Sequence, residues 1–268
     1  MASSRGSPID DIAYLARSEH RAPTLVALTV RPRHRFELKE TAGVSSSTIR
    51  RTLSEFEDRN WIRRVGHRYE ATPLGAYVAS AMADLIERVE TERKVRDVWQ
   101  WLPDEDSGFT IEMCVDAVVT VAEADNPYAP INRFLTLLRE TDTFRFVGSS
   151  LALLEPCREE FCGQIIDGMR AELVDSPNVA RYIRSTYPEL SSRTLESGNL
   201  TVELYDDLPP YGVGIFDHRI AICGHDFDSV TVRVLLDTDS RDARRWAEST
   251  YSLYRRRAPT VPLETVVE

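Results

Sequence analysis

Hydroxyl and guanidinium groups gather on one side of a short stretch, GVSSSTIRRTLSEFEDRNWIRR, at residues 43–64. With a 3.6-residue period, Ile49, Leu53 and Phe56 fall on one apolar stripe. The opposite side carries the polar residues Ser46, Ser47, Arg50, Arg51 and Ser54. That polar side could donate hydrogen bonds to phosphates and base edges. An ordinary solvated helix divides its residues in the same way, so the rest of the chain must decide between the two interpretations.

The charge of the chain makes this stretch unusual. The formal net charge is -10, and lysine occurs only at Lys39 and Lys94, so nearly all the basic residues are arginine. This composition is typical of a GC-rich genome and of a halophilic cytoplasm. Residues 1–101 carry 17 basic and 14 acidic residues, whereas residues 102–268 carry 16 basic and 29 acidic. A basic segment in an acidic chain indicates a partner for that segment.

Several classes of protein are excluded. No apolar run reaches the roughly 18–20 residues that cross a bilayer, and acidic residues interrupt the N-terminal segment where a signal peptide is apolar. We therefore expect a cytoplasmic protein with no membrane partner. The cysteines Cys114, Cys157, Cys162 and Cys223 form no C-x-x-C pair and have no metal-ligand spacing with histidine. We expect reduced core thiols, no metal and no cofactor.

The N-terminal part predicts a helical domain with a hairpin, residues 1–72. Helices are expected over 9–18, between Pro23 and Pro32, over 35–43 with Gly43 as a stop, and from Ser45 or Ser46 to about residue 58. WIRRVGHRYEAT, 61–72, reads as two short strands around a glycine turn. The pattern from Leu74 to Leu102 predicts one long helix. Residues 73–102 are interpreted as a connector and dimerisation helix, and the alternative is a helix that only caps the N-terminal domain.

The remainder, residues 107–268 after the linker PDEDSG at 103–108, alternates strands and helices. We expect strands at 114–124, 143–150, 169–176, 199–207, 212–225 (a hairpin) and 229–238, and helices at 127–141, 156–168, 177–190 and 242–257. Such an order predicts an α/β domain with a mixed sheet. The fold class is therefore multidomain α/β.

The order of elements in residues 20–72 resembles the winged helix-turn-helix of MarR/ArsR-like prokaryotic regulators. The matching residues are Ala42, Gly43, Val44, Ser45, Ser47, Thr48, Ile49, Arg51 and Leu53. The tract from Leu53 through FEDRNWIRRVGHRYEATPLG resembles the end of a recognition helix, a wing and the next helix. The whole layout resembles archaeal transcription regulators with a TrmB-like α/β effector domain, whose fold is related to phospholipase D.

This resemblance implies where DNA would lie. The N-terminal part of a recognition helix enters the major groove, and arginine can bind guanine through two hydrogen bonds. The expected DNA-binding residues are Ser46, Ser47, Thr48, Arg50, Arg51, Arg63, Arg64, His67 and Arg68. Arg63 and Arg64 alternate across a strand, so we expect only one of them to face DNA.

The second domain offers no catalytic constellation. Phospholipase D chemistry needs a His-x-Lys pair, and residues 102–268 contain no lysine. His225 and Asp226 are adjacent in a strand and would point to opposite faces. A ligand pocket at the carboxyl ends of the strands is expected instead. The candidate ligand-binding residues are Ser149, Ser150, Asp175 with its neighbour Ser176, Tyr211, Asp217 and His218.

We therefore expect a sequence-specific DNA-binding transcriptional regulator, not an enzyme. Its partners would be operator DNA, a second copy of the chain and a small-molecule effector. Two alternatives remain: an adaptor whose winged helix binds protein, and a nuclease or hydrolase that uses the α/β domain.

Overall fold

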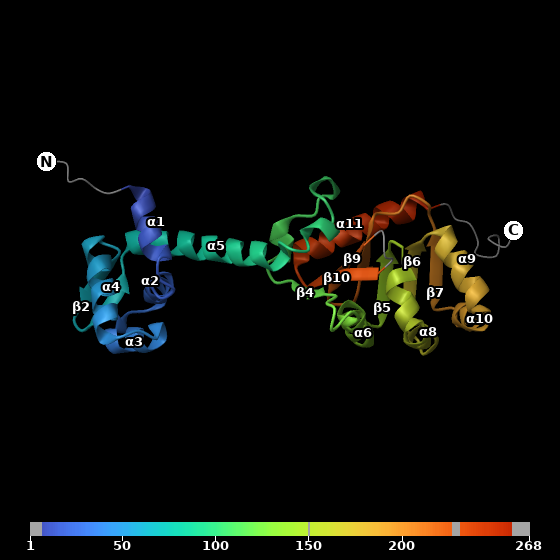
Figure 1. Ribbon diagram of the computed structural model, residues 1–268, viewed down its shortest axis with the longest axis horizontal. Helices are drawn as coiled ribbons and strands as arrows, with labels where there is room; N and C mark the ends of the chain where they lie inside the picture. The colour runs from blue at the N-terminus through green and yellow to red at the C-terminus, as the bar shows by residue number, and fades with distance from the viewer. Residues whose placement is uncertain (1–6, 150, 227–230, 259–268) are drawn as a thin grey trace. The chain divides into compact units, whose positions relative to one another are not determined.

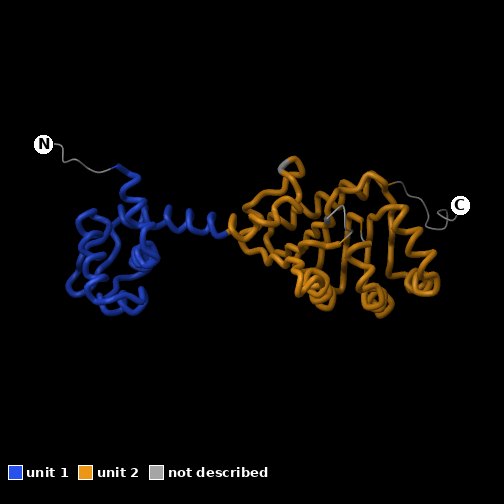
Figure 2. The backbone as a smooth tube through the Cα atoms, in the orientation of Figure 1, with its two compact units in different colours: residues 1–90 blue, residues 91–268 orange. Residues whose placement is uncertain are grey.

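The computed structural model describes residues 7–149, 151–226 and 231–258. The chain divides into two compact units, residues 1–90 and residues 91–268 (Figure 2). We call them the N-terminal unit and the C-terminal unit. No helix of the described residues is long and apolar enough to cross a membrane.

The N-terminal unit is a winged helix-turn-helix, as predicted (Figure 1). Its elements in order are α1 (Pro8–Ala16), α2 (Arg21–Val30), β1 (Arg33–His34), α3 (Arg35–Ala42), α4 (Ser46–Asp58), β2 (Ile62–Val65), β3 (Arg68–Ala71) and α5 (Pro73–Val95). The three short strands form one antiparallel sheet in the order β1-β3-β2. The β2–β3 hairpin is the wing.

One apolar cluster holds this unit together. Every helix of the unit and the wing strand β2 contribute to it, and its members are Leu15, Leu25, Leu28, Leu38, Ile49, Leu53, Phe56, Trp61, Ile62 and Ala79. Gly75 lets α5 approach the base of the wing, since a Cβ at that position would lie 1.8 Å from the carbonyl oxygen of Trp61. A larger residue there would separate α5 from the wing.

The long helix is shorter than predicted. It was expected to reach Leu102, but α5 ends at Val95 and a 3-10 turn, η1 (Trp99–Trp101), follows. The apolar stripe resumes at Val95 and Val98 because these side chains, with Leu102, are buried in the core of the C-terminal unit. The apolar residues after α5 belong to the core of the C-terminal unit, and the prediction wrongly took them for a continuation of the helix. Residues 103–108 also belong to this unit, where the Ser107 carbonyl accepts a hydrogen bond from the Trp246 indole at 2.9 Å.

The C-terminal unit is built on one seven-stranded mixed sheet in the order β4-β10-β9-β8-β5-β6-β7. Its strands are β4 (Val118–Val121), β5 (Thr143–Val147), β6 (Arg170–Asp175), β7 (Leu200–Leu204), β8 (Tyr211–Ile215), β9 (Ile220–Asp226) and β10 (Thr231–Thr238). Among the strand pairs of the described residues, β5–β6 and β6–β7 are parallel and the others are antiparallel. The first strand begins at Val118 instead of residue 114, because η3 (Ile111–Cys114) precedes it as a 3-10 helix.

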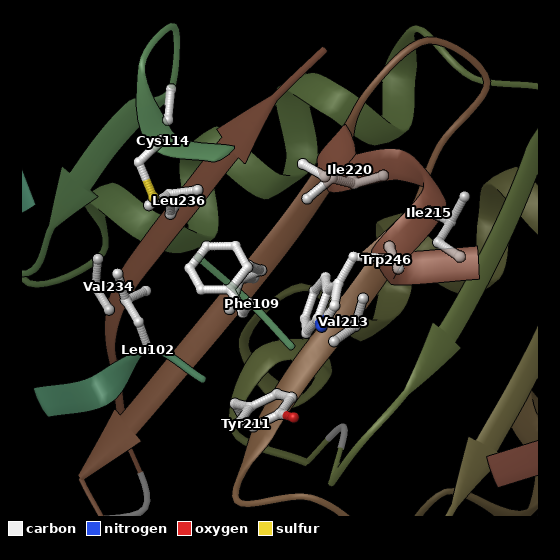
Figure 3. Packing of buried hydrophobic residues seen from close by; sticks show 14 of the residues in the cluster. Leu102, Phe109, Cys114, Tyr211, Val213, Ile215, Ile220, Val234, Leu236 and Trp246 are labelled. Atoms are coloured by element: carbon white, nitrogen blue, oxygen red, sulfur yellow. The ribbon is translucent and has the colours of Figure 1, made fainter. Parts of the chain in front are cut away.

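Helices cover both faces of this sheet (Figure 1). They are α6 (Ala129–Arg139), α7 (Leu151–Leu154), α8 (Arg158–Ile166), α9 (Pro177–Thr186), α10 (Pro188–Glu196) and α11 (Arg241–Arg257), with the 3-10 turns η2 (Glu105–Ser107) and η4 (Glu155–Cys157). On one face α11 packs over β8, where Phe109 and Trp246 meet with ring centroids 5.1 Å apart (Figure 3). On the other face α6 and α8 cover a second core that includes Phe134, Phe144 and Phe161.

The helix predicted over 177–190 is two helices. It breaks at Tyr187, which adopts φ -129° and ψ 58° before Pro188. A residue that precedes proline is disfavoured in the α conformation. The break lets α10 turn back and pack beside α8.

Candidate nucleic-acid interface

Helix α4 presents the polar face that the sequence predicted. The left-handed turn at Gly43, with φ 63°, separates α3 from α4, and the Ser45 hydroxyl caps α4 by accepting a hydrogen bond from Thr48 N at 3.1 Å. The helix buries Ile49, Thr52, Leu53 and Phe56. Ser46, Ser47, Arg50 and Arg51 are exposed, and Thr48 is half-buried.

The arginines of α4 form no ion pairs with the neighbouring carboxylates of the described residues. Glu55 accepts from Arg59, with 2.7 Å between Oε2 and Nη1, and Arg59 also pairs with Asp11 at 2.9 Å. Within the described part of the chain, neither Arg50 nor Arg51 forms an ion pair or a hydrogen bond from its side chain. Two guanidinium groups therefore stand exposed on the N-terminal half of α4.

A partly buried hydrogen-bond chain joins α4 to the segment between α1 and α2. His20 Nε2 lies 3.0 Å from the Thr52 hydroxyl, and His20 Nδ1 lies 2.7 Å from the Ser18 hydroxyl. Burial lowers the pKa of His20, and the positive charges of Arg21 and Arg51 lower it further. The neutral imidazole is thus the form that fits this site.

The wing carries four further candidates, all exposed. Arg63 pairs with Glu70 across the hairpin at 2.6 Å. Arg64 donates to the Gly66 carbonyl at 2.9 Å, which fixes the turn that Gly66 makes with φ 61°. Arg68 and His67 are both tied to His34: Arg68 Nε donates to His34 Nε2 at 3.1 Å, and the His67 carbonyl lies 3.0 Å from His34 Nδ1.

His34 is a residue that the sequence interpretation missed. It lies in the two-residue strand β1, next to β3, and its imidazole bridges both positions at the tip of the wing. Two exposed cations on α3, Arg35 and Lys39, also lie on this unit and were not proposed. A strand of two residues leaves no periodic signal, so only the extended dipeptide after Pro32 could have indicated it.

The residues proposed for a ligand pocket do not converge. Ser149 follows β5, Asp175 ends β6 and Tyr211 begins β8. Because β8 runs antiparallel to β5, these three residues lie at the same end of the strands. Asp217 and His218 lie in the turn between β8 and β9, at the opposite end of the strands. Ser150 lies outside the described residues.

Two of these residues have structural roles. Tyr211 is buried in the core under α11, and burial raises its pKa (Figure 3). Asp217 accepts hydrogen bonds from Asp142 N, at 2.7 Å, and from the Thr143 hydroxyl, and so fastens the β8–β9 turn to the start of β5. Although burial raises the pKa of Asp217, these hydrogen bonds outweigh it and hold the pKa below its usual value.

The described residues contain no group of three or more histidine, cysteine, aspartate or glutamate side chains that could hold a metal ion. All four cysteines are free thiols, three of them buried and Cys162 half-buried. Burial raises the pKa of Cys114 and Cys157 to about 12.

Two family models match the chain. Residues 9–94 match the HVO_A0261 N-terminal domain, and residues 127–257 match the middle domain of the methanogenesis regulatory protein FilR1. Together the matches cover most of the sequence. Among curated proteins, none matches the chain significantly.

Solved structures give weaker likenesses. TrmBL2, an archaeal chromatin protein whose structure shows a novel mode of DNA binding, is 13% identical with a TM-score of 0.42, and the match covers 94% of this chain and 99% of that one. The dimethyltransferase RosA from Streptomyces davawensis is 18% identical with a TM-score of 0.24, over 75% of this chain and 66% of that one. CalO1, a methyltransferase of calicheamicin biosynthesis, is 18% identical with a TM-score of 0.23, over 75% and 68%. Scores this low carry no argument about function.

Proposed function

Since the chain belongs to a family of archaeal transcription regulators, with an HVO_A0261 N-terminal domain and a FilR1 middle domain, we propose that it binds a specific DNA site as a homodimer. The C-terminal unit would sense a small molecule or mediate assembly. Neither unit would be an enzyme.

The observation that carries the proposal is the pair of unengaged arginines on α4. Arg50 and Arg51 project from the half of the helix that enters the major groove in helix-turn-helix proteins. The hydroxyls of Ser46 and Ser47 stand beside them and can bond to base edges or phosphates. A surface that had only to be soluble in an acidic protein would not need this concentration of positive charge.

The wing would contact the DNA backbone. Arg64 and Arg68 are exposed and bonded only to neutral partners, the Gly66 carbonyl and the His34 imidazole, so each retains its positive charge for phosphates. Arg63 is partly neutralised by Glu70. Arg64 and Arg68 are therefore better candidates than Arg63.

The homodimer would form through α1 and α5. Tyr77, Ala81, Leu85 and Val89 recur at every fourth residue along α5 and lie on one stripe. Tyr77 is 81% exposed, and Leu85 and Val89 are each 47% exposed. Three residues of this stripe line a groove between α1 and α5, whose wall is mainly apolar and also includes Asp11 and Trp61. Burying it against a second copy would place two recognition helices about one DNA turn (~34 Å) apart, or a multiple of that distance.

The test is DNA binding across a salt series. The full chain would be titrated with its own upstream DNA and with random DNA, in parallel with the double variant Arg50→Ala/Arg51→Ala. We expect a preferred site for the wild type, and for the variant loss of that preference and a salt slope reduced by up to about 2.

A matched control removes the same charge elsewhere. Arg17→Ala/Arg193→Ala changes two exposed arginines outside the proposed contact surface and should leave the preferred site bound. If neither wild type nor control binds DNA at any salt concentration, α4 serves another partner, and the adaptor interpretation replaces this one.

A further inference from the structure

The C-terminal unit contains a cavity that none of the sequence candidates except Asp175 touches. It lies between the β6–β7 edge of the sheet and helices α8, α9 and α10, and has a volume of about 100 Å³. Its wall is mainly apolar, and includes Phe161, Leu173, Ile183 and Leu195. The break between α9 and α10 at Tyr187 creates this space, because α10 turns back over it.

Three charged side chains also line the cavity: Arg158, Arg184 and Asp175. Asp175 is almost fully buried, and its Oδ1 accepts a hydrogen bond from Ser176 N at 2.7 Å.

Arg158 is held in place but incompletely bonded. Its guanidinium lies over the ring of Tyr187, 4.2 Å from the centroid, and Nη1 donates to the Glu155 carbonyl at 3.1 Å. The carboxylates of Glu155 and Glu159 lie 3.8 and 3.9 Å from its nitrogens, beyond hydrogen-bond distance. Within the described residues, Nε and Nη2 of Arg158 thus have no hydrogen-bond acceptor. That edge of the guanidinium matches a carboxylate that accepts two parallel bonds.

Tyr187 holds the Glu155 carboxylate at a distance from the Arg158 guanidinium. Its hydroxyl donates to Glu155 Oε1 at 2.5 Å, and this bond, with burial, raises the pKa of Tyr187 to about 12. The phenol therefore stays protonated at neutral pH, and the ring stays fixed beneath Arg158.

We propose that this cavity binds a small monocarboxylate with a compact, branched apolar body, the body between α8, α9 and α10 and the carboxylate on Arg158. An engineered apolar cavity of about 150 Å³ holds benzene, so this one suits a body of about four carbons. Binding of this ligand does not depend on the proposed regulator function. Its role as an effector does rest on that function.

Binding itself can be measured without DNA. Thermal unfolding of the full chain would be followed with isobutyrate, isovalerate and pivalate as probes. Isovaleramide lacks the charge, and acetate lacks the body. At about tenfold above Kd, a true ligand should raise the Tm of the C-terminal unit by about 4 °C. The proposal is overturned if none of the three probes shifts Tm, or if isovaleramide or acetate shifts it equally.

Three variants locate the site. Arg158→Gln removes the cation at a partly exposed position and should weaken isovalerate binding at least about tenfold. Ala180→Leu fills the cavity from α9 and should abolish binding. Arg181→Gln, on the exposed side of α9, is the control and should bind as wild type does. Each shift is taken relative to the same variant without probe, and unchanged binding in the first two variants would place the ligand elsewhere.

The coupling to DNA is a separate measurement. Affinity for the preferred site would be compared with and without isovalerate, and we expect a change of about fivefold or more. If isovalerate binds in the cavity but the protein binds no DNA, the ligand site stands and the regulator function fails. If DNA is bound and no probe binds, the reverse holds.

Discussion

The two units of the chain use arginine in different ways. In the N-terminal unit, Arg50 and Arg51 are exposed, and no carboxylate of the described residues pairs with them. In the C-terminal unit, ion pairs join Arg133 and Arg219 to Asp237, and Arg139 to Glu160, and further pairs engage Arg145, Arg244 and Arg255. Arg59 and Arg63 of the N-terminal unit are ion-paired as well, so the difference lies in α4, where two adjacent guanidinium groups are exposed without a carboxylate partner among the described residues.

Apolar side chains follow the same division. Of the large apolar residues that are exposed in the described chain, ten lie in residues 1–90 and four lie in residues 91–268, although the second unit is twice as long. Unpaired charge and uncovered apolar surface together mark the N-terminal unit as the part that meets partners. In the C-terminal unit, the incompletely bonded Arg158 lines a cavity.

The largest expected effect follows from removing the carboxylate of Asp237, which two arginines of the C-terminal unit share. Its carboxylate is fully buried, and it accepts from Arg133 at 2.8 and 2.7 Å and from Arg219 at 2.6 Å. Asp237→Ala would leave two guanidinium groups without their partner, and we expect the free energy of unfolding of the C-terminal unit to fall by about 3–5 kcal/mol. Urea unfolding followed by fluorescence would measure it.

Asp242→Ala is the matched control. Asp242 pairs with Arg245 on the surface of α11, where both side chains are more than half exposed. Its loss should change stability by less than about 1 kcal/mol. Equal losses in the two variants would mean that arginine pairing in this unit is not structural.

The next test concerns the exposed stripe of α5. Leu85→Glu would place a charge in the proposed homodimer interface, and we expect the dimer dissociation constant to rise at least tenfold, or about 1.4 kcal/mol. Sedimentation or light scattering over a concentration series would detect it. Ser80→Glu, on the opposite side of α5, should leave the dimer intact. A monomeric wild type would show that this stripe serves another partner.

In the N-terminal unit, periodicity predicted those elements whose burial pattern follows from local spacing. The inward residues of α4 and the hairpin at 62–71 were predicted from spacing alone, and both were confirmed. His34 was missed because its role depends on Arg68, which is 34 residues away in sequence.

The C-terminal unit was predictable as an α/β sheet but not as a binding site. Asp217 was proposed as a ligand contact, yet it bonds to Asp142, 75 positions away, a pairing that no local pattern reveals. The cavity is lined by residues between Leu154 and Val202 from six elements, and it exists only because the helix predicted over 177–190 breaks at Tyr187. Arrangements that depend on long-range packing leave no periodic trace in the chain.

A smaller effect is expected at the start of α4. The Ser45 hydroxyl satisfies Thr48 N, so Ser45→Ala should lower the stability of the N-terminal unit by about 1 kcal/mol. Ser54→Ala, an exposed serine within the same helix, should be neutral or slightly stabilising, because alanine has the higher helix propensity. If both variants behave alike, the cap does not hold the recognition helix in position.

The smallest effect is a dependence on pH in the N-terminal unit. Burial and the charges of Arg21 and Arg51 hold the pKa of His20 below its ordinary value, so the unfolded chain binds its proton first as the pH falls. The contribution of neutral His20 is therefore present above about pH 6.5 and is lost as the pH falls through the lower, folded-state pKa. Thermal unfolding between pH 7.5 and pH 5 should show this decline in the wild type. His20→Gln keeps a polar side chain that can reach Thr52 but does not titrate, so its N-terminal unit should lose less stability over the same interval. An identical decline in the variant would assign the pH dependence to other groups and leave the His20–Thr52 contact without a role in holding α4.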